Sequence, residues 1–298
     1  MNFKNIIVGV LLLLSIATAN ASQTITVYWP FGIGDPVVTN LRALFDKANQ
    51  IQTEYNFLIV AVPGAGGAIA ARKTITSQET AVLATTSAFF VRPMLFSDSG
   101  YTFDEFKPSL VMSSSPFALV ANNKFDNTWS GNLSIGIAGI GSTTHIISEK
   151  IKQQYPKLTI VPYKGLSDST NDVIAGHVNL SFNLIRAAEQ YPDIKILGIT
   201  GTNRIKDYKL LNELGINGVE HAVINVVILR PGTMSLPMSN RIDEILKQAN
   251  DDNARLMEIY KQDSTTAYSF KTQSQRDEWY QRQIQELKKL TKGIKIAE

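Results

Sequence analysis

A glycine-rich turn is the stretch of this sequence with the clearest potential to bind a ligand. Residues 58–62 are apolar at nearly every position and predict a short buried strand, which Pro63 ends. The turn Gly64-Ala65-Gly66-Gly67 then allows backbone angles that a side chain would forbid, and helix-forming residues follow from Ala68. The start of such a helix has free backbone N–H groups and a positive dipole end, which together can hold an anionic group such as a carboxylate.

The same turn could also serve only to connect a strand with a helix, and the sequence is compatible with both roles. It does exclude the phosphate-binding fingerprints. A dinucleotide-binding site would need glycine or alanine where Ile69 stands, and a P-loop would need to end in Gly-Lys-Ser or Gly-Lys-Thr. The sequence therefore predicts a small anion site without a phosphate signature.

A second candidate is a set of side chains of the kind that hydrolases use. Ser142, His145 and Glu149 fall on one face of a predicted helix. However, a nucleophile elbow needs Gly-x-Ser-x-Gly, whereas the chain has Gly139-Ile140-Gly141-Ser142-Thr143. Ser142 fits better as a helix N-cap, and the three histidines lack the spacing of metal ligands. We therefore expect that the protein is not an enzyme and binds neither a metal nor a cofactor. A hydrolase that uses Ser142 and His145 is the less favoured alternative.

Binding of a small carboxylate explains these turns better than catalysis does. In a cleft between two domains, backbone N–H groups and hydroxyls from opposing turns would meet most of the ligand's charge. Five cations could add a salt bridge, although each is also typical of a solvated surface charge. They are Arg42, Arg72, Arg92, Lys164 and Arg186. Of these we retain only Lys164 as a candidate.

Strands that alternate with helices must position these turns. Strands are predicted over residues 24–29, 57–62 and 80–85, with helical spacing of Leu41, Leu44 and Ala48 between the first two. This alternation indicates an α/β protein with a parallel sheet and crossover helices. Ligands bind beyond the carboxyl ends of such strands, where the turns of the first block fall. These turns are residues 30–35, 64–67 and 85–87.

A second α/β block begins near residue 132 and repeats this order of strand, turn and helix. The long apolar segments 110–122, interrupted by Pro116, and 222–229 are natural connections between the two blocks. We therefore predict one lobe from residues 22–121 and 224–298, and the other lobe from residues 122–223. Two terminal helices, one opened by Pro237 and one carrying Trp279, should pack on the first lobe.

Residues 1–21 have the pattern of a secretory signal peptide. They combine Lys4, an apolar run too short to span a bilayer as an anchor, and Ala19-Asn20-Ala21 at the predicted cleavage site. Removing Lys4 lowers the basic residues from 29 to 28 against 26 acidic ones, which is too small an excess to indicate a nucleic-acid partner. The chain has no cysteine, so disulfides and a thiol nucleophile are excluded. We expect an exported monomer.

Five short motifs occur in order along the mature chain. They are Pro30-Phe31, Pro63-Gly64-Ala65-Gly66-Gly67, Gly141-Ser142-Thr143-Thr144-His145, Val161-Pro162-Tyr163-Lys164-Gly165 and Gly176-His177-Val178-Asn179-Leu180. With these motifs the chain resembles the Bug family, the periplasmic substrate-binding proteins of tripartite tricarboxylate transporters. The resemblance extends from Thr24 to about Lys292, which is nearly the whole mature chain.

The resemblance implies a two-lobed periplasmic binding protein of type II, with two crossover connections between the lobes. Such a receptor would bind a di- or tricarboxylate, an aromatic acid or an acidic amino acid in the cleft and deliver it to membrane permease subunits. A sensory protein feeding a signalling system is the alternative. By position, the implied ligand contacts are Phe31, Gly32, Ile33, Gly34, Gly64, Ala65, Gly66, Gly67, Thr85, Thr86, Ser87, Gly141, Ser142, Thr143, His145, Tyr163 and Asn183.

The chain also departs from the family's pattern around the implied site. The first loop of the family usually ends in Gly-Gly with an Asp shortly after, but here Gly34 is followed by Asp35, and Val38 stands at the later position. Asn179 and Asn183 replace two aspartates of the second lobe. Asp35 could pair with an amine of the ligand or cap the following helix, and the capping role is favoured.

Overall fold

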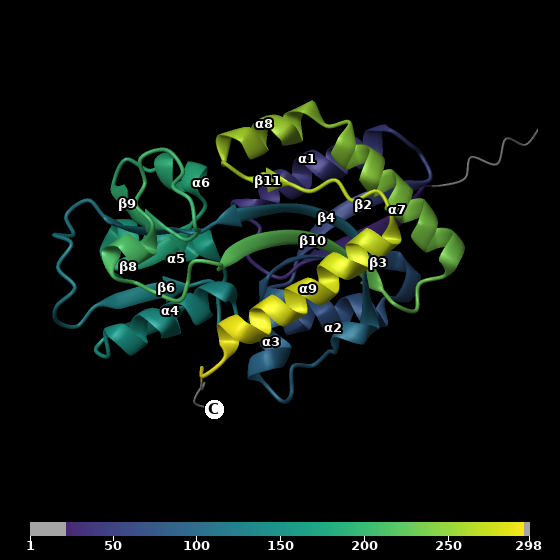
Figure 1. The fold of residues 1–298 in the computed structure, drawn as a ribbon. Coiled ribbons are helices and arrows are strands. Elements are labelled where there is room, and N and C mark those ends of the chain that lie inside the picture. Colours follow the sequence, from purple (N-terminus) through teal and green to yellow (C-terminus); the bar gives the residue numbers. More distant parts are fainter. Residues whose placement is uncertain (1–21, 295–298) are drawn as a thin grey trace, which may run out of the picture.

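Two β-sheets flanked by helices form the computed structural model, which describes residues 22–294 (Figure 1). One sheet has six strands and the other has five, and each is the core of one lobe. The predicted signal peptide, residues 1–21, lies outside the described residues. Within the described range no helix is both long and apolar enough to cross a membrane.

The sheet of the first lobe is mixed, whereas the sequence predicted a parallel one. Its strand order is β11-β4-β10-β3-β1-β2. The strands are β1 (Gln23–Trp29), β2 (Tyr55–Ala61), β3 (Ala81–Thr86), β4 (Phe106–Pro116), β10 (Val223–Pro231) and β11 (Thr266–Ala267). β1 runs parallel to β2 and β3, as predicted, but β10 is antiparallel to both β3 and β4. β10 is antiparallel to β3 because the chain returns from the second lobe, so that β10 begins beside the C-terminal end of β3.

Helices cover both faces of this sheet because its strands alternate apolar side chains between the two faces. Val82 and Ala84 of β3 pack into one apolar cluster, and Leu83 packs into another. The first cluster includes residues of α1 (Val37–Gln50), α7 (Leu236–Asp251) and α8 (Ala254–Gln262). The second includes residues of α2 (Ala68–Thr76), α3 (Ala88–Leu95) and α9 (Gln273–Thr291).

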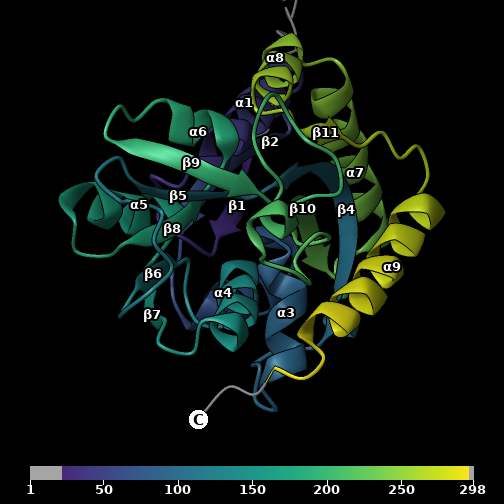
Figure 2. The same ribbon diagram turned by 60° about the vertical axis from the view of Figure 1, so that its left-hand side comes forward.

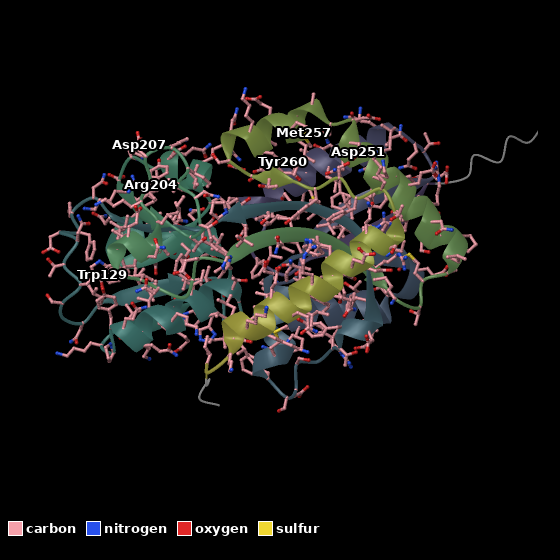
Figure 3. The ribbon with its side chains drawn as sticks, viewed as in Figure 1. Trp129, Arg204, Asp207, Asp251, Met257 and Tyr260 are labelled. Atoms are coloured by element: carbon pink, nitrogen blue, oxygen red, sulfur yellow. The ribbon has the colours of Figure 1, made fainter. Side chains whose placement is uncertain are left out.

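The terminal helices pack on the first lobe, as predicted. Ile242 of α7 lies in the first cluster, and Trp279 of α9 lies in the second. Helix α8 shows how one face is buried: Tyr260 lies in the core, whereas Met257 is exposed on the surface (Figure 3). The helices after residue 235 therefore stabilise the lobe rather than line the cleft.

The second lobe repeats the order of strand, turn and helix on a smaller scale. Its sheet has the order β7-β6-β8-β5-β9, with β6 parallel to β7 and β8, and β5 antiparallel to β8 and β9. The strands are β5 (Ala118–Asn122), β6 (Ser134–Ile137), β7 (Thr159–Pro162), β8 (Leu180–Asn183) and β9 (Ile194–Ile199). The helices are α4 (Thr143–Gln154), α5 (Leu166–Ala175) and α6 (Ile185–Glu189).

The chain crosses between the sheets twice, from β4 to β5 and from β9 to β10 (Figure 2). Residues 118–121 pair with β8 and β9 of the second sheet, so their predicted place in the first lobe is wrong. The first crossing therefore lies between Pro116 and Ala118. Composition could not place it, because the strands on both sides of Phe117 are largely buried and follow each other without a polar loop.

Candidate ligand-binding site

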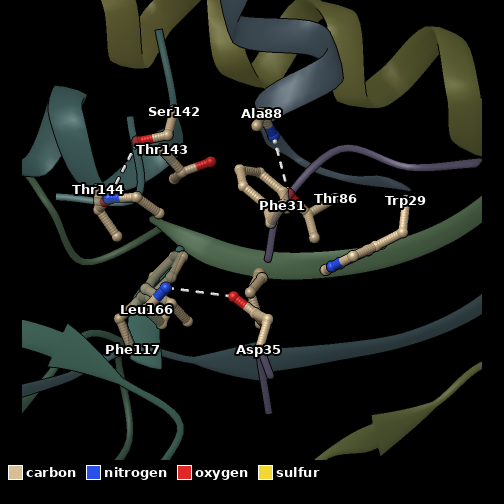
Figure 4. Close-up of a pocket in the computed structure, with 12 residues that line it drawn as sticks. Trp29, Phe31, Asp35, Thr86, Ala88, Phe117, Ser142, Thr143, Thr144 and Leu166 are labelled. Atoms are coloured by element: carbon tan, nitrogen blue, oxygen red, sulfur yellow. Dashed lines mark hydrogen bonds between the residues drawn. The ribbon is translucent and has the colours of Figure 1, made fainter. Parts of the chain in front are cut away.

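A small cavity lies between the two lobes, and we call it the inner cavity (Figure 4). Its volume is about 20 Å³, which is close to the space that a single water molecule needs. It is lined by Trp29, Phe31, Asp35, Thr86, Ala88, Phe117, Ala138, Ser142, Thr143, Thr144, Leu166 and Ile224. These residues come from both lobes, and Phe117 lies in the first crossing.

Four helices start at the inner cavity. Thr143, Ala88 and Leu166 are the first residues of α4, α3 and α5, and Asp35 lies two residues before the start of α1. The N-terminus of a helix carries unpaired N–H groups and a partial positive charge. The cavity is therefore suited to an anion, although no lysine or arginine is among its lining residues.

The hydroxyl of Thr143 is the polar group of the inner cavity that lacks a partner. The residue is 3% exposed, and Oγ1 has no hydrogen-bond partner among the described residues. By contrast, Thr86 Oγ1 accepts the Ala88 N–H at 3.3 Å, and Ser142 Oγ lies 2.8 Å from Thr144 Oγ1. A buried hydroxyl without a partner is costly, so a bound polar group at this position would satisfy it.

Asp35 joins the two lobes through both of its carboxylate oxygens. Oδ1 accepts the N–H of Val37 at the start of α1, at 3.1 Å, and Oδ2 accepts the N–H of Leu166 at the start of α5, at 3.2 Å. The first bond agrees with the predicted capping role. Burial raises the pKa of Asp35 to about 6, against the opposing effect of the two N–H groups.

The glycine-rich turn lies at a second hollow, the outer cavity, of about 310 Å³. It is lined by Pro30, Phe31, Pro63, Gly64, Ala65, Gly66, Ala138, Gly139, Ile140, Tyr163 and Lys164. Phe31 and Ala138 line both cavities, so the two hollows are adjacent. Gly66 has φ +59°, and a Cβ atom there would lie 2.4 Å from the carbonyl oxygen of Ile140 in the second lobe.

Eight of the residues that the sequence analysis proposed line one of the two cavities. They are Phe31, Thr86, Ser142 and Thr143 in the inner cavity, and Phe31, Gly64, Ala65, Gly66 and Tyr163 in the outer one. The others line neither cavity: Gly32, Ile33, Gly34, Gly67, Thr85, Ser87, Gly141, His145 and Asn183.

Several of these remaining residues hold the cleft together. The N–H of Gly32 donates to the Lys164 carbonyl at 3.0 Å, and the carbonyl of Gly34 accepts the Ser167 hydroxyl at 2.7 Å. Asn183 donates to Thr170 Oγ1 at 2.9 Å and is buried within the second lobe. These contacts support the site without lining it.

Sequence reasoning missed the aromatic and aliphatic lining of the inner cavity. Trp29 and Ile224 lie in strands that the sequence predicts, whereas the start of α5 at Leu166 and the crossing at Phe117 were not predicted. All four residue types resemble ordinary core residues. Proximity to a predicted turn was the signal available: Trp29 precedes Pro30-Phe31, and Leu166 follows the Pro-Tyr-Lys-Gly motif.

Ser142 and His145 do not form a catalytic pair in this structure. Ser142 Oγ accepts the backbone N–H of His145 at 3.1 Å, which confirms the predicted N-cap. His145 Nδ1 accepts the N–H of Gly141 at 3.1 Å, and Nε2 lies 3.6 Å from Glu149 Oε1. The imidazole therefore fixes the turn before α4 and does not bond to the Ser142 hydroxyl.

His145 is expected to make the protein less stable in acid. Burial, with a smaller effect of Lys152, lowers the pKa of His145 from 6.5 to about 4. The folded state then binds fewer protons than the unfolded state, so stability falls as the pH drops from 6.5 towards 4. His145→Asn, whose amide oxygen can still accept the Gly141 N–H, should remove up to about 3 kcal/mol of this acid-dependent loss. Urea unfolding at several pH values measures it, and an equal loss in parent and variant would contradict it.

Comparisons with known proteins agree on family and fold. A family profile described as "Tripartite tricarboxylate transporter family receptor" matches residues 42–296. A search among curated proteins found no match. The solved structure of the periplasmic binding protein BugD superposes with a TM-score of 0.79 at 20% identity, covering 90% of this chain and 96% of that one.

Two further solved structures were determined with ligands. MatC from Rhodopseudomonas palustris with bound malate has a TM-score of 0.80 at 19% identity, covering 90% of this chain and 99% of that one. A second R. palustris protein, with adipate, has a TM-score of 0.78 at 18% identity, covering 90% of this chain and 96% of that one. At these identities the similarity concerns the fold, and it confirms the predicted two-lobed periplasmic binding protein architecture.

Proposed function

The chain belongs to the tripartite tricarboxylate transporter receptor family, and we propose that it binds a small carboxylate between its two lobes. The observation that supports this most directly is the buried, unpartnered hydroxyl of Thr143 in a cavity where four helices start. A carboxylate placed there would accept a hydrogen bond from the Thr143 hydroxyl and lie at the positive ends of the helix dipoles. It would need no lysine or arginine in the lining.

We further propose that the lobes part to admit this ligand. The inner cavity of about 20 Å³ is too small for a carboxylate with a carbon body. The crossings β4–β5 and β9–β10 would act as the hinge, with residues 22–116 and 223–294 moving against the second lobe. The short contacts across the cleft, such as Gly32 N–H to the Lys164 carbonyl, would form on closure.

Export and delivery to a permease complete the proposal. BugD is described as a periplasmic binding protein, and the two liganded relatives hold malate and adipate, which are both carboxylates. Together with the predicted signal peptide, these relatives support a periplasmic receptor that passes its ligand to the membrane subunits of a tripartite tricarboxylate transporter.

Thr143→Val tests the proposed site with little change in shape. The substitution removes the hydroxyl but keeps a branched side chain, so we expect the affinity for a bound carboxylate to fall about tenfold, near 1.4 kcal/mol. The melting temperature of the ligand-free protein should not fall, because the hydroxyl has no partner to lose. Calorimetric titration with mono- and dicarboxylates of two to eight carbons gives the affinities.

Ser148→Ala is the matched control for this experiment. Ser148 lies on the same helix and also has a buried hydroxyl without a partner among the described residues, but it does not line the inner cavity. Its replacement should leave the affinity unchanged. If no carboxylate binds the parent protein, the proposed function fails, and equal affinities of parent and Thr143→Val would place the carboxylate elsewhere.

A further inference from the structure

The carboxylate of Asp35 occupies a position that suits an anion shared by both lobes. It accepts one backbone N–H at the start of α1 in the first lobe and one at the start of α5 in the second, at 3.1 and 3.2 Å. Asp35 is buried, with 4% of the residue exposed, and it lines the inner cavity (Figure 4). Two helix N-termini that face each other across a cleft would otherwise attract an anionic group of the ligand.

The surroundings of Asp35 leave no cation to offset a second anion beside it. The lining of the inner cavity contains the rings of Trp29, Phe31 and Phe117 and no lysine or arginine. Asp168 in the first turn of α5 interacts electrostatically with Asp35 and has the same sign. A ligand carboxylate placed next to Asp35 would therefore meet like charge in a poorly hydrated space.

The opposite side of the same cavity offers a different environment. There Thr143 Oγ1 lacks a partner, and α3 and α4 start without an acidic residue in their first turns. A ligand carboxylate can bind at the Thr143 side, while the carbon body of the ligand would contact the rings of Trp29, Phe31 and Phe117. The two sides of the cavity thus differ in the charge that they can accept.

We infer that Asp35 restricts this receptor to monocarboxylates with an uncharged body. Its side chain takes the place that the second carboxylate of a dicarboxylate would otherwise have between α1 and α5. With the lobes parted far enough to hold the ligand, its own carboxylate binds near Thr143, and its body lies against Trp29, Phe31 and Phe117. This inference rests on the proposed function, since it assigns the ligand class to the same site.

Matched pairs of acids test this selectivity by calorimetric titration. Suitable pairs are butyrate with succinate, hexanoate with adipate, and benzoate with terephthalate, at about pH 8, where the acids and Asp35 are ionised. We expect the parent protein to bind the preferred monocarboxylate at least about tenfold more tightly than its dicarboxylate partner. Asp35→Asn keeps the size of the side chain and removes its charge, and it should reduce this ratio at least about tenfold.

Asp252→Asn provides the control, because it changes the net charge equally but lies exposed at the C-terminal end of α7, outside the lining of the inner cavity. It should leave the ratio unchanged. If Asp35→Asn does not fold, Asp35→Ser keeps an oxygen acceptor, and the ratio in the parent protein remains a test by itself.

Two outcomes overturn the inference and leave the proposed function intact. One is a parent protein that binds a dicarboxylate as tightly as its monocarboxylate partner. The other is a ratio that stays the same in Asp35→Asn. Absence of binding for every acid in parent and variants would overturn both the inference and the proposed function.

Discussion

Replacement of Gly66 by valine is expected to abolish ligand binding while the protein still folds. Gly66 has φ +59°, and its added Cβ would lie 2.4 Å from the carbonyl oxygen of Ile140 in the other lobe. This contact is with backbone, so a side-chain rotation cannot relieve it, and the lobes could not close to the same extent.

Gly66→Ala should give a graded version of the same effect, with affinity reduced at least about tenfold, or about 1.4 kcal/mol. Gly176→Ala is the control, because Gly176 also has a positive φ of +80° but no atom within 4 Å of an added Cβ. It should lower stability by a similar amount without changing affinity. Titration with the best monocarboxylate and thermal unfolding decide the outcome. If Gly66→Val binds as tightly as the parent, the close approach of the turn to Ile140 is not needed for closure around the ligand.

The local part of the fold could be predicted from the sequence because its signals are local. Two patterns span only a few residues. Ser142 stands three residues before the backbone N–H that it caps, and the turn Gly64 to Gly67 follows an apolar strand. Helix α3 is missing from the sequence prediction because it lacks such a local signal. Its residues Ala88–Leu95 are largely apolar and contain Pro93, so no helical periodicity stands out.

The pairing of strands and the inner cavity depend on contacts between distant residues. The antiparallel position of β10 follows from its return from the second lobe, which no window of sequence reveals. The hydrogen bond between Asp35 and Leu166 joins residues 131 positions apart. The sequence could mark Asp35 as unusual and as a cap, but only the closed arrangement of the lobes brings it to the start of α5.

Asp243→Asn is expected to be the most destabilising conservative change in the first lobe. Asp243 on α7 lies 2.9 Å from Arg276 on α9 and 3.5 Å from Arg230 on β10, measured between oxygen and nitrogen atoms. All three residues are buried, with exposures of 6% to 8%. Arg276 also donates to the Pro108 carbonyl on β4 at 3.3 Å. The cluster thus ties two helices to both strands that lead to the second lobe.

Removing the negative charge leaves two buried guanidinium groups facing each other without compensation. Loss of one partner from a buried ion pair typically costs about 3–5 kcal/mol, so Asp243→Asn should lower the free energy of unfolding by that amount. The control is Asp46→Asn, because Asp46 and Arg255 form an exposed pair with side-chain exposures of 57% and 65%. Its effect should stay below about 1 kcal/mol. Urea unfolding at neutral pH measures both, and equal effects of the two substitutions would show that the buried cluster contributes no more than a surface pair.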